Sequence, residues 1–553
     1  MVSYPHRTFA VYAVIIALAV VASATSLSNG FAFDDVALIA RNPQVHSLDG
    51  WWRLFAKAYW PPQQGESLYR PVVTLGFALQ WWAGGGSPLS FHITSVALYA
   101  LASGLTYALI RRVVRTPAAA FAAAALYAVH PVHVEAVGNV VGQSELLAAV
   151  ATLAASIVYL NARLHGRLRG KPTTAIALLF AVACLSKEHA LLLPAILMAL
   201  ELLAVHDTNA GSLTRRFREM LPLFSVLALV AVAYLTARTL VLGELLGEKH
   251  LVPVVGMRRL WVMLAVAPHW LRLLFFPARL SADYSPHHIE LPRSPGLAVL
   301  PGIIVLIAVA ALYRALGAGS EESAEDRRTG RLAIALGGLT LLPVSNLFSV
   351  MVIAERALFM PSVAAMIGIG AVGSAVARRL GASRAAAMGG RAMGAVTGLL
   401  LIAGAWKSGE RQHVWRDNAS LFRQTVTDAP RSYRAQFFYG QLLFEQGRRT
   451  EGERHLRRAI ELNPTPSDVS PLNYLATQYR IGGLCAPALP LYERAIAADD
   501  TRPDVRYGLA ACLLETGRVE DARRVAEDGV RRGDLRSLFQ ELLAKSDSAS
   551  VRG

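Results

Sequence analysis

The sequence predicts an all-α protein in two parts, a polytopic bundle of membrane helices followed by a solenoid of helical hairpins. Three observations support this prediction. The chain of 553 residues is 54% hydrophobic, which is too apolar for a soluble globule of this size. Apolar stretches of about 17–25 residues, the length that crosses a bilayer, recur up to residue 406. From Trp415 onward, charged residues and an internal repeat replace these stretches.

About eleven spans account for the apolar stretches of the first part. They lie near residues 8–26, 92–110, 117–130, 142–160, 173–187, 189–206, 220–242, 296–313, 332–345, 358–377 and 392–406. Two further stretches, 72–83 and 257–277, are short or interrupted by Pro268, and their aromatic and basic flanks predict helices lying in the membrane interface. We expect the first span to be retained, because cleavage after it would remove the anchor just before Asp34.

Lys and Arg are distributed unevenly between the predicted loops. The inside loops carry 19 Lys/Arg in 69 residues, whereas the outside loops carry 12 in 124. The net charge of +16 therefore reflects membrane topology, and we expect membrane lipid rather than nucleic acid as a partner. This assignment places Asp34, Asp35 and the chain after residue 406 on the outer face.

Small residues recur at matching positions in the C-terminal part, at offsets of 36 and then 34 residues. The matching sets are Gly440, Ala476 and Ala510; Gly447, Gly483 and Gly517; Gly452, Ala488 and Ala522; and Ala459, Ala495 and Gly529. A period near 34, with small residues where two helices pack closely, is typical of the tetratricopeptide repeat. We expect a membrane domain at 1–409, a repeat domain at 410–545 and a frayed tail at 546–553.

Metal, disulfide and nucleotide signals are weak. The spacing of Cys184, Cys485 and Cys512 predicts neither a metal site nor a disulfide framework. His287 and His288 are too few to define a metal site. A divalent cation is still one of two ways to stabilise the charge of a phosphate leaving group, the other being basic side chains. The sequence has no phosphate-binding glycine loop, so an enzyme facing outward would need an activated donor carried by a lipid.

Two adjacent carboxylates, Asp34 and Asp35, follow the first span directly. Neighbouring residues point in different directions, so one carboxylate would act as a general base while the other binds a partner or a metal. The alternative is a helix cap or a solvated loop pair.

Three basic residues at predicted outer ends of spans are candidates for binding a phosphate. Arg70 precedes the interfacial stretch, although an ordinary membrane anchor would look the same. Lys187 lies in a tight turn beside Glu188, and the alternative is an ion pair between these two neighbours. Arg356 starts a span and would pair either with Glu355 or with a phosphate.

Five further residues are expected to support the site, namely Glu188 and Glu355, already described as neighbours of Lys187 and Arg356, and His133, Glu135 and Glu145. His133 and Glu135 lie at the outer end of the third span, where a structural cap is as good an explanation as a substrate contact. Glu145 begins the returning helix, where the helix dipole favours a carboxylate.

Together these motifs resemble the transmembrane and tetratricopeptide-repeat-containing O-mannosyltransferases, a branch of the C-type integral-membrane glycosyltransferases. The resemblance covers nearly the whole chain. It rests on Phe33-Asp34-Asp35, Tyr69-Arg70-Pro71, His130-Pro-Val-His133-Val-Glu135, Gly142-Gln143-Ser144-Glu145, Ser186-Lys187-Glu188, Ala354-Glu355-Arg356 with the following Ala-Leu-Phe-Met-Pro361-Ser362, and the repeats.

The resemblance implies transfer of a mannose-like sugar from a polyprenyl-phosphate donor to a protein or other hydroxyl acceptor, with inversion at the anomeric carbon. It also implies that an acidic residue of the first outer loop, here Asp34 or Asp35, is the base. The concave surface of the repeats would hold a peptide acceptor. The composition indicates a bacterial inner membrane, with the active site and the repeats on the periplasmic side.

Two other functions are compatible with parts of the sequence. A non-enzymatic scaffold would use the repeats to assemble envelope proteins and would not need the aspartates. A transporter would show inverted repeats with charges at mid-membrane, whereas the ionisable residues here lie at one face.

Overall fold

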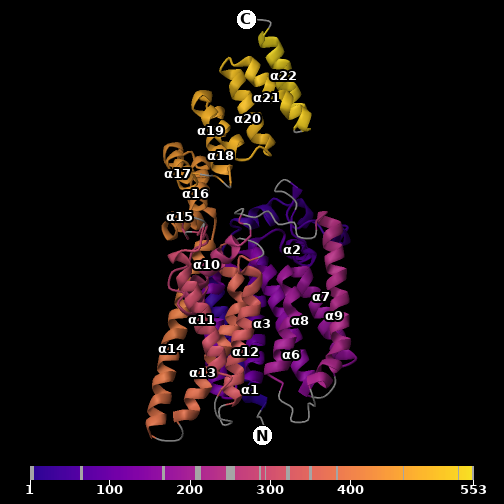
Figure 1. Ribbon diagram of the computed structural model, residues 1–553, viewed down its shortest axis with the longest axis vertical. Helices are drawn as coiled ribbons and strands as arrows, with labels where there is room; N and C mark the ends of the chain where they lie inside the picture. The colour runs from indigo at the N-terminus through magenta and orange to yellow at the C-terminus, as the bar shows by residue number, and fades with distance from the viewer. Residues whose placement is uncertain are drawn as a thin grey trace. The chain divides into compact units, whose positions relative to one another are not determined.

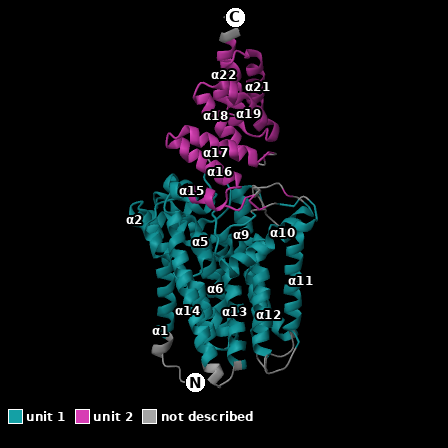
Figure 2. Ribbon diagram, turned by 90° about the vertical axis from the view of Figure 1, so that its left-hand side faces the viewer, with its two compact units in different colours: residues 1–249, 255–282, 291–421 teal, residues 250–254, 283–290, 422–553 magenta. Residues whose placement is uncertain are grey.

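The computed structural model describes two compact units, coloured separately in Figure 2. The first consists of residues 1–249, 255–282 and 291–421, and the second of 250–254, 283–290 and 422–553. The described residues are 5–62, 67–164, 168–205, 213–244, 254, 256–285, 288–289, 291–292, 294–318, 324–347, 352–380, 384–464, 466, 468–533 and 535–550. His287 and the last three residues lie outside them.

The first unit is a bundle of helices that run in roughly the same direction (Figure 1). In chain order the helices are α1 (Pro5–Ser23), α2 (Pro71–Gly84), α3 (Pro88–Val113), α4 (Pro117–Ala128), α5 (Val134–Gly138), α6 (Gln143–Leu164), α7 (Lys171–Ser186), α8 (Leu193–Leu203), α9 (Leu213–Leu242), α10 (Arg258–Phe275), α11 (Leu300–Ala315), α12 (Ala324–Leu341), α13 (Phe359–Leu380), α14 (Arg384–Gln412) and α15 (Asn418–Asp428), whose later residues belong to the second unit. Helix α1 begins at one end of the bundle, and α2 and α10 lie at the other.

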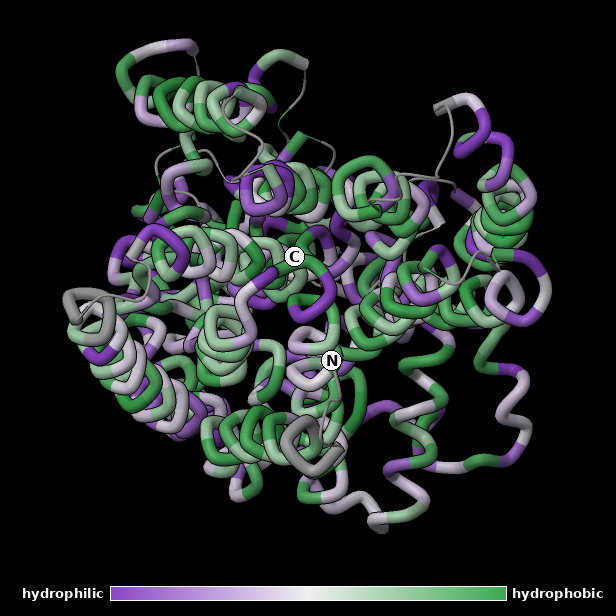
Figure 3. The backbone as a smooth tube through the Cα atoms, turned by 90° about the horizontal axis from the view of Figure 1, so that it is seen from below, coloured by the Kyte–Doolittle hydropathy of each residue, from purple (hydrophilic) through white to green (hydrophobic). Residues whose placement is uncertain are grey.

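Seven helices of the described chain are long and apolar enough to cross a membrane, or eight if the bent pair at Pro117–Ala128 and Pro131–Gly138 is one span. Viewed along the bundle, many helical turns of the chain are hydrophobic (Figure 3). The seven are Phe9–Ser28, Pro88–Val113, Val140–Leu164, Thr214–Leu242, Leu297–Ala315, Glu355–Arg379 and Met388–Trp415. Each coincides with an expected span, and together they make this a multi-pass membrane protein.

The remaining expected spans fall on helices that are short or carry charge. Helix α7 has 16 residues and α8 has 11, while α12 begins with a charged turn. The two stretches expected in the interface form α2 and α10, which are not among the spanning helices. Trp82 of α2 is 71% exposed, and Phe275 at the end of α10 is 55% exposed, whereas Val262 and Trp270 of α10 are buried. Both features suit amphipathic helices at a membrane surface.

Small residues bring the central helices close together. Ala120, Ala123 and Ala124 of α4 are completely buried. A Cβ atom on Gly370 of α13 would lie 3.0 Å from Val114, and one on Gly373 would lie 3.3 Å from Ala119. Because lipid tails are as apolar as the helices, close packing at small residues is a main source of helix association in a membrane.

The segment between α1 and α3 covers the end of the bundle opposite the N-terminus (Figure 1). It contains the short helices η2 (Val36–Ala40), η3 (Pro43–Val45) and η4 (Trp51–Ala56). The Gly30 N–H donates to the Arg416 carbonyl oxygen (2.8 Å), and the Phe33 N–H donates to Asn418 Oδ1 (2.7 Å). The first loop and the chain that leaves α14 therefore lie at the same end of the bundle.

The second unit is a run of paired helices. They are α16 (Tyr433–Glu445), α17 (Arg449–Leu462), α18 (Ser470–Ile481), α19 (Cys485–Ala498), α20 (Pro503–Glu515), α21 (Val519–Arg532) and α22 (Arg536–Ser550). Gly447, Gly483 and Gly517 link the two helices of successive pairs, each with a φ between +73° and +79°, a conformation that favours glycine. A Cβ on Gly440 would lie 3.0 Å from the Gly452 carbonyl oxygen, so small residues are required where the helices cross.

The cysteine prediction was wrong for two of the three residues. Cys485 at the start of α19 and Cys512 of α20 form a disulfide, while Cys184 is buried in α7. The pairing could not be predicted from the sequence, because a sequence separation of 27 between the two cysteines matches no recognised disulfide spacing. It becomes visible only once the repeat places successive helices side by side.

Candidate functional site

Three ion pairs assemble at the end of the bundle that the first loop covers. The first joins Arg70, which precedes α2, to Glu188 in the turn between α7 and α8. Arg70 Nε lies 3.1 Å from Glu188 Oε2, and Nη2 lies 2.7 Å from Oε1, so the pair is bidentate. Burial acts to lower the pKa of Arg70, but the Glu188 carboxylate outweighs burial and holds that pKa above its usual value. Burial likewise acts to raise the pKa of Glu188, and Arg70 holds it well below its usual value.

The second ion pair joins Lys187 to Glu145 in the first turn of α6. His189 Nε2 lies 3.4 Å from the other oxygen of the same carboxylate. Burial lowers the pKa of Lys187, and Glu145 offsets part of this effect. The sequence left open a pair between Lys187 and its neighbour Glu188, but in the structure the two residues bind different partners.

The third ion pair joins Arg356 to Glu135 of α5 through a guanidinium nitrogen. The Arg356 backbone N–H also donates to Glu135 Oε2 (2.9 Å). Glu355, the neighbour considered as a partner for Arg356, is buried and accepts a hydrogen bond from the Ser281 N–H (2.7 Å) instead. Through this hydrogen bond, Glu355 connects the segment after α10 to the start of α13.

The two aspartates of the first loop have different environments. Asp35 is completely buried and accepts backbone hydrogen bonds from Val141 (2.9 Å), Val140 (3.2 Å) and Ala32 (3.5 Å). Burial raises the pKa of Asp35 from 3.8 to about 7, against the opposing effect of these donors. Asp34 is half-buried and keeps part of its side chain accessible. Asp35 therefore holds the loop in place, and Asp34 is the carboxylate that a ligand can reach.

Asp34 lies within electrostatic reach of Arg356, one of the cations of the cluster. Its charge acts on Arg356, on Asp35 and on Tyr59. The Arg70 guanidinium lies over the Tyr59 ring, 5.2 Å from its centroid. Tyr59 is 3% exposed, and its hydroxyl has no hydrogen-bond partner among the described residues. Sequence analysis did not single out Tyr59, because it lies in an irregular loop without a motif.

Both ring nitrogens of His133 contact hydroxyl groups inside the bundle, which indicates a structural role for this residue. Its Nδ1 lies 3.0 Å from the Tyr99 hydroxyl, and its Nε2 lies 2.8 Å from the Ser362 hydroxyl. The ring is 1% exposed. Both ring nitrogens are therefore engaged inside the bundle, where they connect α3, the segment before α5 and α13.

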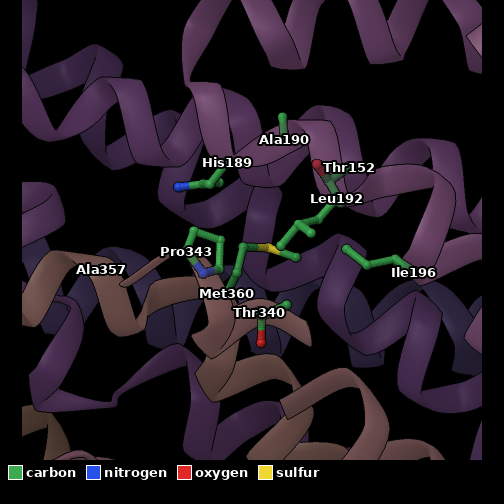
Figure 4. Close-up of a pocket in the computed structure, with 9 residues that line it drawn as sticks. All are labelled: Thr152, His189, Ala190, Leu192, Ile196, Thr340, Pro343, Ala357 and Met360. Carbon is green, nitrogen blue, oxygen red and sulfur yellow. The ribbon is translucent and has the colours of Figure 1, made fainter. Parts of the chain in front are cut away.

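A mainly apolar pocket lies next to this cluster, between α6 and α8 on one side and α12 and α13 on the other (Figure 4). His189 lies at its edge, and Leu192 and Met360 approach each other within it. The lining residues are Thr152, His189, Ala190, Leu192, Ile196, Thr340, Pro343, Ala357 and Met360. The cavity volume of the pocket is about 20 Å³, so it has room for only a small part of an apolar ligand.

Among the residues that the structure describes, no group of three or more His, Cys, Asp or Glu is placed to hold a metal ion. His287 of the pair considered from the sequence lies outside those residues. A resident metal held by side chains alone therefore has no candidate site in the described chain.

The spanning helices and the repeats define a multi-pass membrane protein with a tetratricopeptide-repeat domain. Family models of the tetratricopeptide repeat match residues 411–465 and 486–546. They confirm the repeats expected from the spacing of small residues.

The chain is homologous to the transmembrane and tetratricopeptide-repeat-containing O-mannosyltransferases, which confirms the resemblance seen in the motifs. It is 27% identical over 468 residues to a protein O-mannosyl-transferase of Caenorhabditis elegans, covering 82% of this chain and 62% of the relative. It is 26% identical over 501 residues to human TMTC1, covering 82% and 55%, and 29% identical over 365 residues to mouse TMTC3, covering 61% and 39%. The chain thus spans less than two thirds of the length of these relatives.

Proposed function

We propose that this protein is an integral-membrane glycosyltransferase that moves a mannose-like sugar from a polyprenyl-phosphate donor to a hydroxyl group of a protein. The observation that carries the proposal is the cluster itself. A half-buried carboxylate, Asp34, lies within electrostatic reach of Arg356, and the apolar pocket is lined by Ala357, next to Arg356. The names of the homologues, protein O-mannosyl-transferases, support the choice of reaction and of a protein acceptor.

In this proposal Asp34 is the general base. It takes the proton of the acceptor hydroxyl as the oxygen attacks the anomeric carbon from the face opposite the phosphate. The bond between the anomeric carbon and the phosphate oxygen breaks with inversion, and the lipid phosphate leaves with the electron pair. Asp35 was an equal candidate in the sequence, but its carboxylate already accepts three backbone hydrogen bonds. Asp35 therefore positions Asp34.

The leaving phosphate gains negative charge, and Arg70, Lys187 and Arg356 lie close enough to one another to stabilise it. Each is held in place by a carboxylate, so the cations are already oriented before the donor binds. Only the first carbons of the prenyl chain would enter the small apolar pocket between α6, α8, α12 and α13. A divalent cation bound by both Asp34 and the donor phosphate would need only one carboxylate from the protein. If such a cation takes part, a chelator should abolish sugar transfer, and added Mg²⁺ or Mn²⁺ should restore it.

The site would face outward, on the periplasmic side of a bacterial inner membrane, together with the repeats. The disulfide between Cys485 and Cys512 supports this location for the repeats, because disulfides persist in oxidising compartments. The concave surface of the repeats would hold the protein acceptor.

Incubation of the purified full chain with radiolabelled polyprenyl-phosphate mannose and membrane extract tests the proposal. Labelled protein is expected with the wild type and not with Asp34→Asn. A non-enzymatic scaffold, the alternative function, predicts no label with either protein and full biological function for Asp34→Asn in cells.

A further inference from the structure

Arg238, near the outer end of α9, is a buried arginine without a counter-charge in the described chain. Its exposed fraction is 6%, and its Nε has no hydrogen-bond partner there. The helix is one of the spanning helices and ends four residues later, at Leu242. A charged side chain in such a place is costly unless something pairs with it, so ionisable residues inside spans usually mark functional sites.

Tyr234 lies one turn before Arg238 on the same helix, and it too has a buried polar group without a hydrogen bond among the described residues. It is 4% exposed, and its hydroxyl has no hydrogen-bond partner among the described residues. Its ring centroid lies 6.1 Å from that of Tyr69, which immediately precedes Arg70. Tyr234 is within electrostatic reach of Arg238, Glu188 and Arg70. Arg238 and Tyr234 therefore flank the pair formed by Arg70 and Glu188 on its α9 side.

Arg238 differs from the other cations of the cluster because it has no carboxylate partner among the described residues. Arg70, Lys187 and Arg356 are each neutralised by a carboxylate from another part of the chain. Arg238 is buried beside the same cluster with no such carboxylate in the described residues. An anion from outside the chain would complete its environment.

We propose that Arg238 and Tyr234 form a binding subsite for the phosphate of a prenyl-type lipid. A guanidinium group and a phenolic hydroxyl can both donate to phosphate oxygens, and the bond from the charged donor is the stronger one. The subsite lies close to the outer end of a spanning helix, which is the depth of a lipid headgroup rather than of a phosphate free in water. The inference rests on the proposed function, because it assigns this subsite to the donor lipid or to the lipid phosphate left after transfer.

Binding of farnesyl phosphate to the purified full chain in detergent tests the subsite without any sugar transfer. Arg238→Gln is expected to weaken farnesyl phosphate binding by about 10- to 100-fold, the value of one or more charge-assisted hydrogen bonds. Arg218→Gln is the matched control, since Arg218 is exposed on the same helix, and this variant is expected to bind like the wild type. Arg238→Lys is expected to recover part of the affinity.

Thermal unfolding separates binding from a general structural role. The ligand-free Arg238→Gln variant is expected to unfold at the same temperature as the wild type or above it, because an uncompensated buried charge has been removed. Farnesyl phosphate should then raise the unfolding temperature of the wild type but not of the variant.

Three results would overturn the subsite: unchanged farnesyl phosphate binding by Arg238→Gln, an equal loss of phosphatidylglycerol binding, or equally strong binding of inorganic phosphate. Failure of the glycosyltransferase proposal gives a different pattern. In that case farnesyl phosphate still binds through Arg238, but no protein is labelled in the transfer assay.

Discussion

Arg70 and Glu188 are separated by 118 residues in the chain and form a bidentate ion pair with contacts of 2.7 and 3.1 Å. The pair fixes the start of α2 against the turn between α7 and α8. Lys187, next to Glu188, pairs instead with Glu145 of α6. Two neighbouring residues of one turn thus connect it to two other segments, and this crossed arrangement holds the cations of the cluster in place.

The first prediction follows from this pair. Arg70→Met and Glu188→Leu, made singly, are each expected to destabilise the protein by about 3 kcal/mol, because each leaves a charge with little access to water. The double variant should recover much of this loss, since no charge is left unpaired. The measurement is the thermal unfolding temperature in detergent for all four proteins of the cycle. Additive losses in the double variant would show that the two side chains do not depend on each other.

The second prediction separates the two aspartates. Asp34→Asn should lower sugar transfer by at least about 100-fold and leave the unfolding temperature unchanged, because it removes a base at an accessible position. Asp35→Asn should lower stability by about 1–3 kcal/mol, because its amide NH₂ would face the N–H groups of Val140 and Ala32. Transfer and unfolding are measured on the same preparations. If Asp35→Asn abolished transfer at full stability, Asp35 would be the base.

The third prediction concerns pH. The pKa of Asp35 is raised from 3.8 to about 7 in the folded protein, so the folded state binds a proton more readily than the unfolded state between these values. The contribution of Asp35 to stability is therefore fully present below about pH 4 and is lost as the pH rises to about 7. Three pKa units correspond to at most about 4 kcal/mol.

This pH dependence is measured as the unfolding temperature of the wild type relative to Asp35→Asn from about pH 5 to about pH 8. As the pH rises, the unfolding temperature of the wild type should fall relative to that of Asp35→Asn. Asp34→Asn serves as the control and should follow the wild type. Parallel curves for the wild type and Asp35→Asn would mean that Asp35 does not titrate in this range.

Much of the cluster could be predicted from the sequence, because membrane topology leaves the polar segments between spans only two faces to occupy. Asp34, Arg70, Lys187 and Arg356 follow or precede spans at positions that the topology places on one face, and the structure brings them together. The partners could not be predicted. Sequence neighbours suggested that Arg356 pairs with Glu355, whereas it pairs with Glu135, 221 residues away.

The residues that were missed share a physical reason. Tyr59 lies in an irregular loop, and its importance comes from burial beside Arg70, which no local pattern encodes. Arg238 lies within an apolar span, where no motif distinguishes it from the rest of that span. In both cases the signal is an unsatisfied polar group, and this can be recognised only when the surrounding side chains are placed.

The fourth prediction concerns the disulfide of the repeats. Replacing Cys485 and Cys512 by serine should lower the stability of the repeat region by about 3 kcal/mol, as expected for a loop of this length. The measurement is the unfolding of the full chain with and without reductant. The reductant should lower the unfolding temperature of the wild type and leave the double variant unchanged. Cys184→Ala, which lacks only the unpaired cysteine, should respond to reductant like the wild type, and a double variant as stable as the wild type would contradict the prediction.

The fifth prediction concerns the apolar pocket beside the cluster. Met360 lies within the pocket, so Met360→Trp should fill it and compete with the prenyl chain of the donor. The KM for polyprenyl-phosphate sugar is expected to rise about tenfold with little change in kcat, because the charged cluster is untouched. Val372→Trp is the matched control, since Val372 is 65% exposed on the same helix. An unchanged KM in Met360→Trp, with the unfolding temperature of the wild type, would place the prenyl chain elsewhere on the bundle. A lowered kcat with unchanged KM would instead mean that the larger side chain disturbs Lys187 or Glu145 rather than the lipid.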